Sequence, residues 1–265
     1  MTSPSKLSLA GLNDVPETLL YPLMSRYVET KKPGGIIHDP KSVEILDGLE
    51  FDVETTKLFT ISSLGVCLRT LIFDEYVQGF LSRNPAGVVI NLGCGLDTRF
   101  ARIDNQQLQW FDLDLPQTIA LKRHFFQETD RYKFIAKSAM DPSWADDVPK
   151  DKKVFVIMEG LSYYFAEEEV KQMLTIIRDS FPGAELAMEA FHPFYIKMTP
   201  SMGSKDPLDK KATGLLKWGI KSGAEIETWF DGVRFVEEQY VIEKQKKAFP
   251  MVHRVLFALL PFLPK

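Results

Sequence analysis

The run Asn91-Leu-Gly-Cys-Gly-Leu-Asp-Thr-Arg99 has the glycine spacing best suited to ligand binding in this chain. Gly93 and Gly95 lack a Cβ, so the backbone can turn tightly there and come close to a ligand. Asp97 or Thr98 can cap the helix that we expect to follow. Because such a turn directs backbone N–H groups and the amino end of a helix toward the ligand, the segment predicts a site for an anionic group.

Two ligand classes compete for this turn, dinucleotides and S-adenosylmethionine. The dinucleotide fingerprint has a third glycine, three residues after the second, which allows close packing of the helix on the strand. Thr98 occupies that position in this chain. The spacing therefore disfavours NAD or FAD without excluding them.

Two acidic residues follow the turn at the distance where a carboxylate accepts hydrogen bonds from ribose hydroxyls, about 20 residues downstream. They are Asp112 and Asp114, at the end of the next expected strand. Side chains two residues apart on a strand share a face, so periodicity does not choose between them. Asp114 lies nearer the carboxyl edge of the sheet, where open α/β sheets bind ligands.

Two further expected strand ends carry groups that a ligand could use. Ser138-Ala139-Met140-Asp141 follows the third strand and offers polar groups for an adenine edge. Glu159 and Gly160 follow the fourth strand, an apolar run. A carboxylate at the mouth of the sheet is a plausible partner for an ammonium or sulfonium group.

The elements that must position these residues alternate between strands and helices. Such alternation predicts a doubly wound, mostly parallel sheet of the Rossmann-like type. An amphipathic helix begins after Ala166 and presents Val170, Met173, Leu174, Ile177 and Phe181 on one face. The expected strands are Val88–Leu92, Leu108–Leu113, Tyr132–Lys137, Lys153–Met158 and Glu185–Phe191.

We expect one large α/β domain with local elaborations, although two smaller domains are possible. Residues 1–85 are predicted to form a helical cap that includes a helix over Ser62–Leu81, and residues 86–191 the binding core. Residues 192–223 are irregular and rich in Pro, Gly, Lys and Met, which is typical of a lid. Residues 224–265 are predicted to complete the core, with a helix at Glu225–Phe230 and a strand at Phe235–Ile242.

The composition argues against some classes of function and partner. The chain has 265 residues, of which 45% are hydrophobic, and a net charge of -4 with both signs interspersed. A nucleic-acid partner is not expected, because it requires a concentrated basic face. Cys67 and Cys94 form no metal-binding motif, so we expect no metal and a reducing, cytoplasmic location.

No membrane association is expected either. The N-terminus lacks the basic start and apolar core of a signal peptide. The segment Val252–Leu263 is interrupted by polar residues and is shorter than the ~18–20 residues that span a bilayer. We interpret it as a packed or interface helix of a monomer or homodimer.

Taken together, the motifs resemble the leucine carboxyl methyltransferase family, in particular its bacterial branch of tetracenomycin-type polyketide O-methyltransferases. The resemblance covers about residues 20–190. It rests on Asn91–Arg99, on Asp112-Leu-Asp-Leu-Pro116 with Lys122, on Glu159-Gly-Leu-Ser-Tyr-Tyr164, on Arg69-Thr70 and on His38-Asp39-Pro40.

This resemblance implies a class I methyltransferase fold and S-adenosylmethionine as methyl donor, with S-adenosylhomocysteine as product. Arg69 and Gly93 would meet the methionine carboxylate, and Asp114 the ribose. Ser138 and Ala139 would lie at the adenine and Glu159 at the methionine amino group. Neighbouring positions of the same motifs, namely Cys94, Gly95, Leu115 and Gly160, complete the implied cofactor site.

The acceptor side is less defined by the sequence. His192 is the candidate general base, since it follows the fifth strand and histidine is the side chain most often used for proton transfer near neutral pH. Aromatic residues favour a small, aromatic or polyketide-like hydroxyl or carboxyl acceptor. Protein C-terminal carboxyl methylation and non-catalytic cofactor binding remain alternatives. The expected pocket residues are Tyr163, Tyr164, Phe191, Tyr195 and Trp218.

Overall fold

The computed structural model describes residue 6 and residues 19–50, 60–202 and 215–241, which form two compact units. The described residues up to Ile72 and those from Gln239 onward belong to the smaller unit, and residues 73–202 and 215–238 to the larger. Helix α3, Thr60–Arg83, contributes residues to both units. The single-domain organisation and its subdivisions stay predictions.

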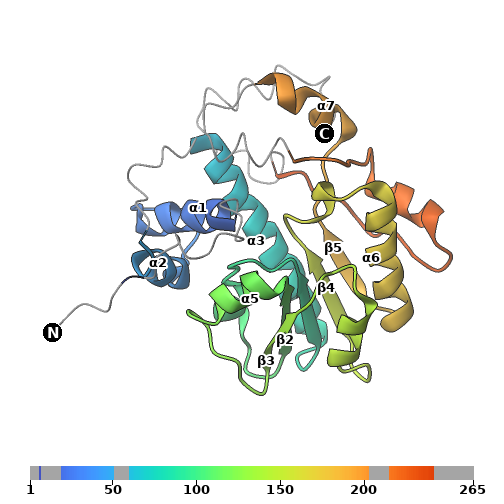
Figure 1. Cartoon of the computed structure of the whole chain (residues 1–265), viewed down its shortest axis with the longest axis horizontal. Coiled ribbons are helices and arrows are strands. Elements are labelled where there is room, and N and C mark those ends of the chain that lie inside the picture. The colour runs from blue at the N-terminus through green and yellow to red at the C-terminus, as the bar shows by residue number, and fades with distance from the viewer. Residues whose placement is uncertain (1–5, 7–18, 51–59, 203–214, 242–265) are drawn as a thin grey trace. The chain divides into compact units, whose positions relative to one another are not determined.

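The larger unit is built on a parallel sheet of five strands in the order β3-β2-β1-β4-β5 (Figure 1). All residues of β1 and β4 are buried, as expected of apolar runs in the centre of a parallel sheet. The predicted Rossmann-like fold is therefore confirmed. The strands are β1 Val88–Leu92, β2 Gln109–Asp114, β3 Tyr132–Ala136, β4 Val154–Met158 and β5 Glu185–Met188.

Strand β5 ends earlier than predicted. Its ladder with β4 runs to Met158 and Met188, and the N–H of Glu189 then donates to the carbonyl of Met158. Because β4 ends at Met158, the residues after Glu189 have no partner strand there. They continue as the loop that carries Phe191 and His192.

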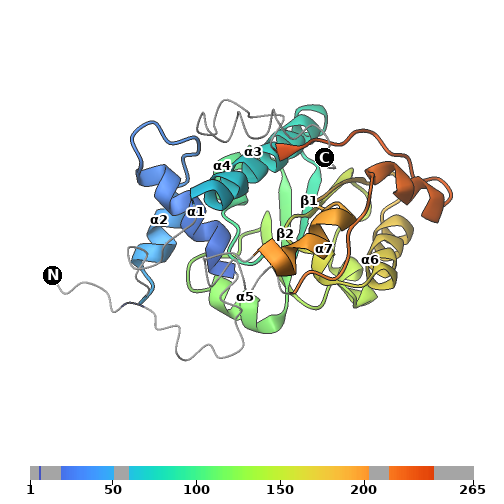
Figure 2. The same cartoon turned by 90° about the horizontal axis from the view of Figure 1, so that it is seen from above.

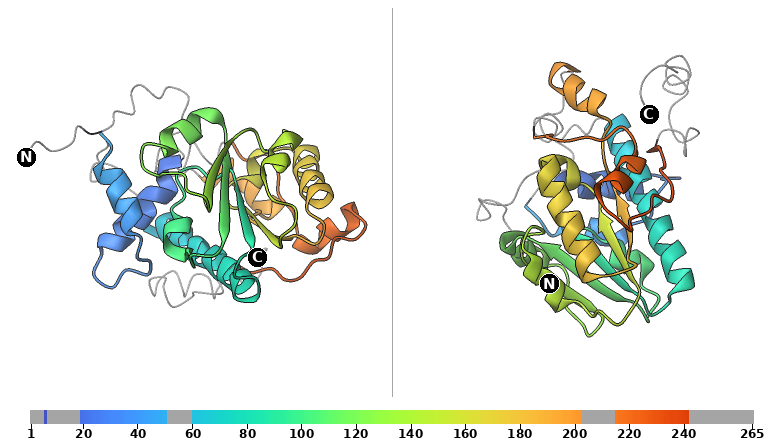
Figure 3. Two further views of the ribbon diagram at one scale, coloured as in Figure 1. Left: turned by 90° about the horizontal axis from the view of Figure 1, so that it is seen from below. Right: turned by 90° about the vertical axis from the view of Figure 1, so that its right-hand side faces the viewer.

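Helix α6, Glu167–Ser180, covers part of the sheet, as Figures 2 and 3 show. Its buried residues Val170, Met173, Leu174 and Ile177 join the core formed by β1, β2 and β4. This is the apolar face that the helical spacing predicts. Shorter helices connect the strands: α4 Arg99–Ile103, α5 Pro116–Lys122, and the 3₁₀ helices η3 Pro142–Asp147 and η4 Ser162–Tyr164.

The segment 192–223 is more regular than its composition indicates, because it begins with helix α7, Pro193–Met202. Proline suits the first turn of a helix, where its missing N–H is not needed. His192 stands just before it, and its Nδ1 accepts a hydrogen bond from the N–H of Phe194 at 3.1 Å. A side chain in this position caps the helix.

The predicted strand Phe235–Ile242 is wrong for its described residues, since 235–240 pair with no other strand. Their polar contacts go instead to the 3₁₀ helix η5, Gly223–Trp229, which stands where we predicted a helix. The N–H of Phe235 donates to Glu227 at 2.6 Å, and the carboxylate of Glu238 accepts from the N–H of Gly223 at 2.9 Å. The segment Val252–Leu263 lies outside the described residues.

The described part of the smaller unit is helical, with α1 Leu20–Lys31, α2 Pro40–Asp47 and the first half of α3. Asp39 caps α2 by accepting from the N–H of Ser42 at 3.1 Å. Its other oxygen pairs with Arg26 at 2.8 Å, with both side chains buried. Among the described residues no helix is long and apolar enough to cross a bilayer.

Candidate active site

The turn after β1 adopts the conformation that its glycines permit. Gly93 and Gly95 have φ angles of 65° and 49°, in the left-handed region that favours glycine. A Cβ on Gly93 would also lie 2.7 Å from Cδ1 of Leu161, in the loop after β4. The left-handed backbone conformation therefore requires glycine at position 93, and the side chain of Leu161 would also have to move to admit a Cβ.

The structure separates the two aspartates that spacing left as alternatives. Asp112 is 1% exposed and forms an ion pair with the buried Lys122 at 2.8 Å. It also accepts hydrogen bonds from Trp110 Nε1 at 2.8 Å, Tyr132 Oη at 2.5 Å and Asn91 Nδ2 at 3.2 Å. Both of its oxygens are thus engaged in the interior, which leaves Asp112 unsuited to a ligand.

Asp114 instead lies at the carboxyl edge, as the last residue of β2, and is half-buried. Its Oδ2 accepts from the N–H of Gly95 at 2.8 Å, and its Oδ1 from the N–H of Leu115 at 2.7 Å. Burial raises the pKa of this carboxyl above its usual range, against the opposing effect of these hydrogen bonds. Asp114 is therefore the acid that borders the glycine turn.

Lys122 connects the glycine turn to strand β2 of the sheet. Its ammonium donates to the carbonyls of Asp97 at 2.9 Å and Gly95 at 3.4 Å, besides its ion pair with Asp112. Burial alone would lower the pKa of Lys122, but the nearby acidic groups, Asp112 foremost, together outweigh it and the pKa is raised. A charged lysine thus holds the conformation of the turn.

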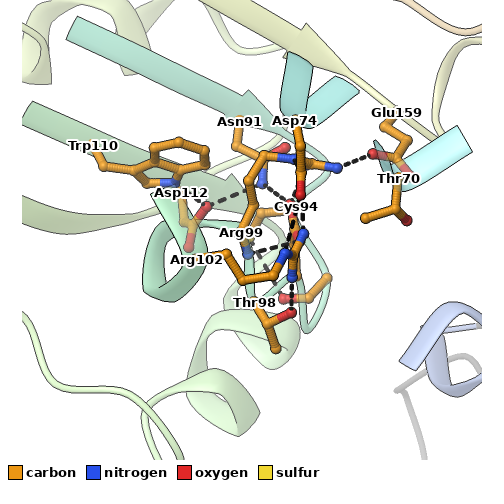
Figure 4. A network of polar contacts seen from close by, with 12 residues as sticks. Thr70, Asp74, Asn91, Cys94, Thr98, Arg99, Arg102, Trp110, Asp112 and Glu159 are labelled. Carbon is orange, nitrogen blue, oxygen red and sulfur yellow. Dashed lines mark hydrogen bonds and ion pairs between the residues drawn. The ribbon is translucent and has the colours of Figure 1, made fainter. Parts of the chain in front are cut away.

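A second buried cation, Arg99, connects the acids around the turn (Figure 4). It is 1% exposed, and its three guanidinium nitrogens pair with Asp74 at 2.6 Å, Asp97 at 2.5 Å and Glu159 at 2.5 Å. Asp97 also accepts from the N–H of Arg99 at 3.0 Å, so it caps α4 in place of Thr98. Thr98 accepts from Arg102 instead, at 2.7 Å.

The remaining predicted cofactor residues lie in loops at strand ends. Gly160 has a φ of 68°, and its N–H donates to Glu189 at 2.8 Å. Ser138 follows β3 and accepts from the N–H of Met140 at 3.2 Å, and Ala139 beside it is buried. Cys94 is buried inside the turn, and burial raises the pKa of its thiol well above the usual range.

Three of the predicted acceptor residues meet in one aromatic cluster. The ring of Tyr163 lies 4.7 Å from the ring centroids of both Tyr164 and Phe191. Its hydroxyl donates to Glu189 at 3.3 Å. Tyr195 packs on Phe194 within α7 instead, at 5.6 Å.

Trp218 belongs to the segment that returns to this edge after α7. It is 6% exposed, lies in the core and packs beside Trp229. The N–H of Lys217 donates to the carbonyl of Tyr163 at 2.8 Å, and that of Ile220 to the carbonyl of Phe191 at 2.9 Å. The segment is therefore anchored at both loops of the aromatic cluster, and its role as a lid stays a prediction.

Comparison with known proteins identifies the fold and the family. A family model described as leucine carboxyl methyltransferase matches residues 22–178, more than half of the chain. The chain belongs to the leucine carboxyl methyltransferase family. It is 30% identical over 234 residues to the tetracenomycin polyketide synthesis O-methyltransferase of Streptomyces glaucescens, covering 88% of this chain and 85% of that protein.

Two further relatives agree with this assignment. An S-adenosyl-L-methionine-dependent methyltransferase of Gibberella zeae is 28% identical over 260 residues, covering 89% of this chain and 85% of that protein. A crystal structure from Thermobifida fusca, of a protein assigned as a methyltransferase, has a TM-score of 0.54 at 16% identity and covers 88% of this chain and 87% of that chain. This last likeness supports the fold alone. The chain is thus an S-adenosylmethionine-dependent methyltransferase.

The edge of the methyltransferase sheet fits this cofactor chemically. S-adenosylmethionine has a carboxylate, an ammonium group and a ribose with two hydroxyls. The turn at Gly93 and Gly95 offers backbone without Cβ atoms, Asp114 borders it, and Glu159 lies beyond it, paired with Arg99. Arg69 lies half-buried on α3 within the smaller unit, so its predicted contact with the methionine carboxylate stays a prediction.

The sequence reasoning missed the ion-pair partners of this methyltransferase site. The glycine motif contains Arg99, but the motif alone indicates no role for it, and no pattern in the sequence marks Asp74 or Glu189. Asp74 follows the apolar run Leu71-Ile-Phe73 in a helix, yet the exposed Glu75 stands beside it, so the run does not show which of the two acids is buried. Only the fold shows that Asp74 is buried and pairs with Arg99.

Replacing Lys122 with Met should destabilise the methyltransferase by about 3–5 kcal/mol, because it leaves the buried Asp112 without its counter-charge. Urea denaturation, followed by circular dichroism, measures this free energy of unfolding. The matched control is Lys150→Met, whose ion pair with Asp146 is exposed on both sides. We expect that control to lose less than about 1 kcal/mol. Equal losses in the two variants would contradict the buried role of Lys122.

Proposed function

We propose that this methyltransferase transfers a methyl group to the oxygen of a small aromatic or polyketide-like acceptor. The observation that carries the proposal is the aromatic cluster of Tyr163, Tyr164 and Phe191, which begins in the loop directly after Glu159. The similarity to an enzyme of tetracenomycin polyketide synthesis, over most of both chains, supports the same acceptor class. Aromatic side chains bind flat, apolar molecules well because they bury large areas.

The proposed cofactor site lies at the carboxyl ends of β1, β2, β3 and β4. Asp114 would accept hydrogen bonds from the ribose, Glu159 would pair with the methionine ammonium, and Gly93 with Arg69 would receive the carboxylate. Leu115, Ser138 and Ala139 would contact the adenine, with Cys94, Gly95 and Gly160 shaping the backbone. When bound, S-adenosylmethionine supplies an electrophilic methyl group on a sulfonium.

The chain's own residues then have two tasks, to align the acceptor oxygen and to exclude water. An in-line displacement depends mainly on holding the two reacting atoms in position. The cluster of Tyr163, Tyr164 and Phe191 would provide a flat apolar wall for this purpose. The returning segment around Trp218 and Ile220, which is buried and anchored at the same loops, would limit access of water.

We propose a different role for His192 from the general base that its place after the fifth strand suggests. Its Nδ1 accepts the N–H of Phe194, so in the neutral ring Nε2 carries the proton. A ring in this state has no free lone pair with which to take a proton from an acceptor. A phenol or carboxylic acid near its own pKa needs little help from a base, and we propose that His192 caps α7.

Replacing Asp114 with Asn should weaken binding of S-adenosylhomocysteine at neutral pH by about 1–3 kcal/mol, because charge-assisted hydrogen bonds to the ribose are lost. Isothermal titration calorimetry measures the affinity. Asp130→Asn is the matched control, since Asp130 is exposed after α5. An unchanged affinity of Asp114→Asn would place the ribose elsewhere.

Binding of S-adenosylhomocysteine to the wild type and to Asp114→Asn should depend differently on pH. The charged carboxylate of Asp114 is the better acceptor, and its pKa in the folded protein is raised by burial. Wild-type affinity should therefore be complete above that raised pKa and fall as the pH is lowered through it, beginning above the ordinary aspartate value of about 3.9. Calorimetry across this range should show that the ratio of wild-type to Asp114→Asn affinity shrinks with acidification. A constant ratio would contradict the role of the charge.

Acceptor class is tested with labelled S-adenosylmethionine and three sets of compounds. We expect methyl transfer to phenolic or hydroxylated polyaromatic compounds, weaker transfer to aromatic carboxylic acids, and none to a peptide that ends in a free leucine carboxylate. Transfer to the peptide alone would favour the protein carboxyl methyltransferase alternative. Cofactor binding without transfer to any set would favour a non-catalytic protein.

His192→Asn should keep its turnover and its pH profile, because asparagine can cap a helix but cannot act as a base near neutral pH. His192→Ala should lose about 1 kcal/mol of stability, because the N–H of Phe194 then lacks its acceptor. The measurements are kcat across pH and thermal unfolding of both variants. A large fall of kcat in His192→Asn, with stability retained, would restore the histidine as base.

A further inference from the structure

Arg99 connects three separate segments at the carboxyl edge of the sheet (Figure 4). Asp74 belongs to α3, Asp97 to the glycine turn and Glu159 to the end of β4. Each carboxylate takes a different nitrogen: Nε pairs with Asp74, Nη1 with Asp97 and Nη2 with Glu159. One guanidinium thus sets the distances among three acids that lie far apart in the sequence.

These ion pairs are almost excluded from solvent, which strengthens their electrostatic attraction and restricts the orientation of the side chains. The side chains of Arg99, Asp74, Asp97 and Glu159 are 1%, 10%, 15% and 10% exposed. A buried carboxylate without a counter-charge would take up a proton instead of remaining ionised. The nearby acids in turn raise the pKa of Arg99 above its ordinary value, against the effect of burial. The guanidinium of Arg99 therefore supplies the counter-charge that an ionised Glu159 carboxylate needs in this buried place.

The guanidinium itself is fixed from the side away from Glu159. Asp74 accepts from Arg99 at 2.6 Å and from two nitrogens of Arg102 at 3.1 Å. Arg102 is anchored further by Thr98, and the guanidinium of Arg99 lies 5.8 Å from the ring centroid of Phe73. Because its planar fork has fixed donor directions, Arg99 constrains the orientation of Glu159 as well as its charge.

We propose that Arg99 is a positioning residue for the methionine end of the cofactor, acting through Glu159. This inference rests on the proposed function, in which Glu159 pairs with the methionine ammonium. Arg99 aims the Glu159 carboxylate and keeps it charged, so that binding energy for the amino acid part of S-adenosylmethionine depends on an arginine that does not bind it. The adenosine part, held at Asp114, does not depend on Arg99.

Two ligands separate these parts of the site. S-adenosylhomocysteine has both the adenosine and the amino acid, whereas methylthioadenosine lacks the amino and carboxyl groups. Calorimetry gives the affinity of each for the wild type, Arg99→Met, Arg99→Lys and Glu159→Gln. The matched control is Arg131→Met, because Arg131 forms its own ion pair with Asp104, at 2.6 Å, and has no part in the described contacts of Arg99.

In Arg99→Met we expect S-adenosylhomocysteine to bind at least about tenfold more weakly, the size of a lost charge-assisted hydrogen bond. The affinity for methylthioadenosine should stay within about twofold of the wild type. Arg99→Lys keeps the charge but not the fork, so it should show an intermediate loss. Arg131→Met should retain the wild-type ratio of the two affinities.

The double variant Arg99→Met with Glu159→Gln tests whether the two residues act as one. If Arg99 acts through Glu159, the double variant binds S-adenosylhomocysteine no more weakly than Glu159→Gln alone. Additive losses, or equal weakening of both ligands in Arg99→Met, would overturn the proposal and leave Arg99 a general structural role. Should Arg99→Met not fold, Arg99→Lys and its double variant decide by the same ratio. Absence of wild-type binding to either ligand would instead overturn the proposed function.

Discussion

A carboxylate removed from water must be matched by a cation, and this constraint shapes the carboxyl edge of the sheet. Two buried side chains, Lys122 and Arg99, supply these cations. Lys122 pairs with Asp112 inside the sheet and donates to carbonyls of the glycine turn. Arg99 pairs with acids from α3, from the turn and from the end of β4. Removing either cation would leave a buried charge uncompensated, so the conformation of the turn and the charge of the edge depend on the same ion pairs.

The constraint also explains why two aspartates on one strand face have different tasks. Asp112 pairs in register with Asn91 of β1 and Phe134 of β3, so it is enclosed by strands on both sides. Asp114 is two residues further on, where β1 has already turned away at Gly93. It accepts from the N–H of Gly95 in the turn and from that of Leu115, instead of pairing with a cation as Asp112 does. These hydrogen bonds hold the carboxylate in place without neutralising it, which agrees with the ribose-binding role that we propose for Asp114.

Local sequence patterns predicted most strands and helices, whereas they did not predict contacts between segments that are distant in the sequence. Four of the five strands begin and end within one residue of the predicted limits, because buried parallel strands are continuous apolar runs bounded by glycine, proline or charge. Phe235–Ile242 has a strand-like composition, yet its described residues contact η5: the side chain of Glu227 accepts from the N–H of Phe235, and the side chain of Glu238 accepts from the N–H of Gly223. Two of the three acidic partners of Arg99 lie 25 residues before it and 60 residues after it, separations that no periodicity reports. The sequence alone does not show that Asp74 is buried, and only the fold brings it to Arg99.

The loop after β4 carries residues that we propose for both the cofactor side and the acceptor side of the site. Its first residue, Glu159, is held by Arg99. The next residues are held by Glu189, which accepts from the N–H of Gly160, the hydroxyl of Tyr163 and, through its carbonyl, the hydroxyl of Ser162. Because Arg99 fixes the start of the loop and Glu189 fixes the residues up to Tyr163, the loop has few independent degrees of freedom. The order of the aromatic cluster therefore depends on Glu189, as the position of Glu159 depends on Arg99.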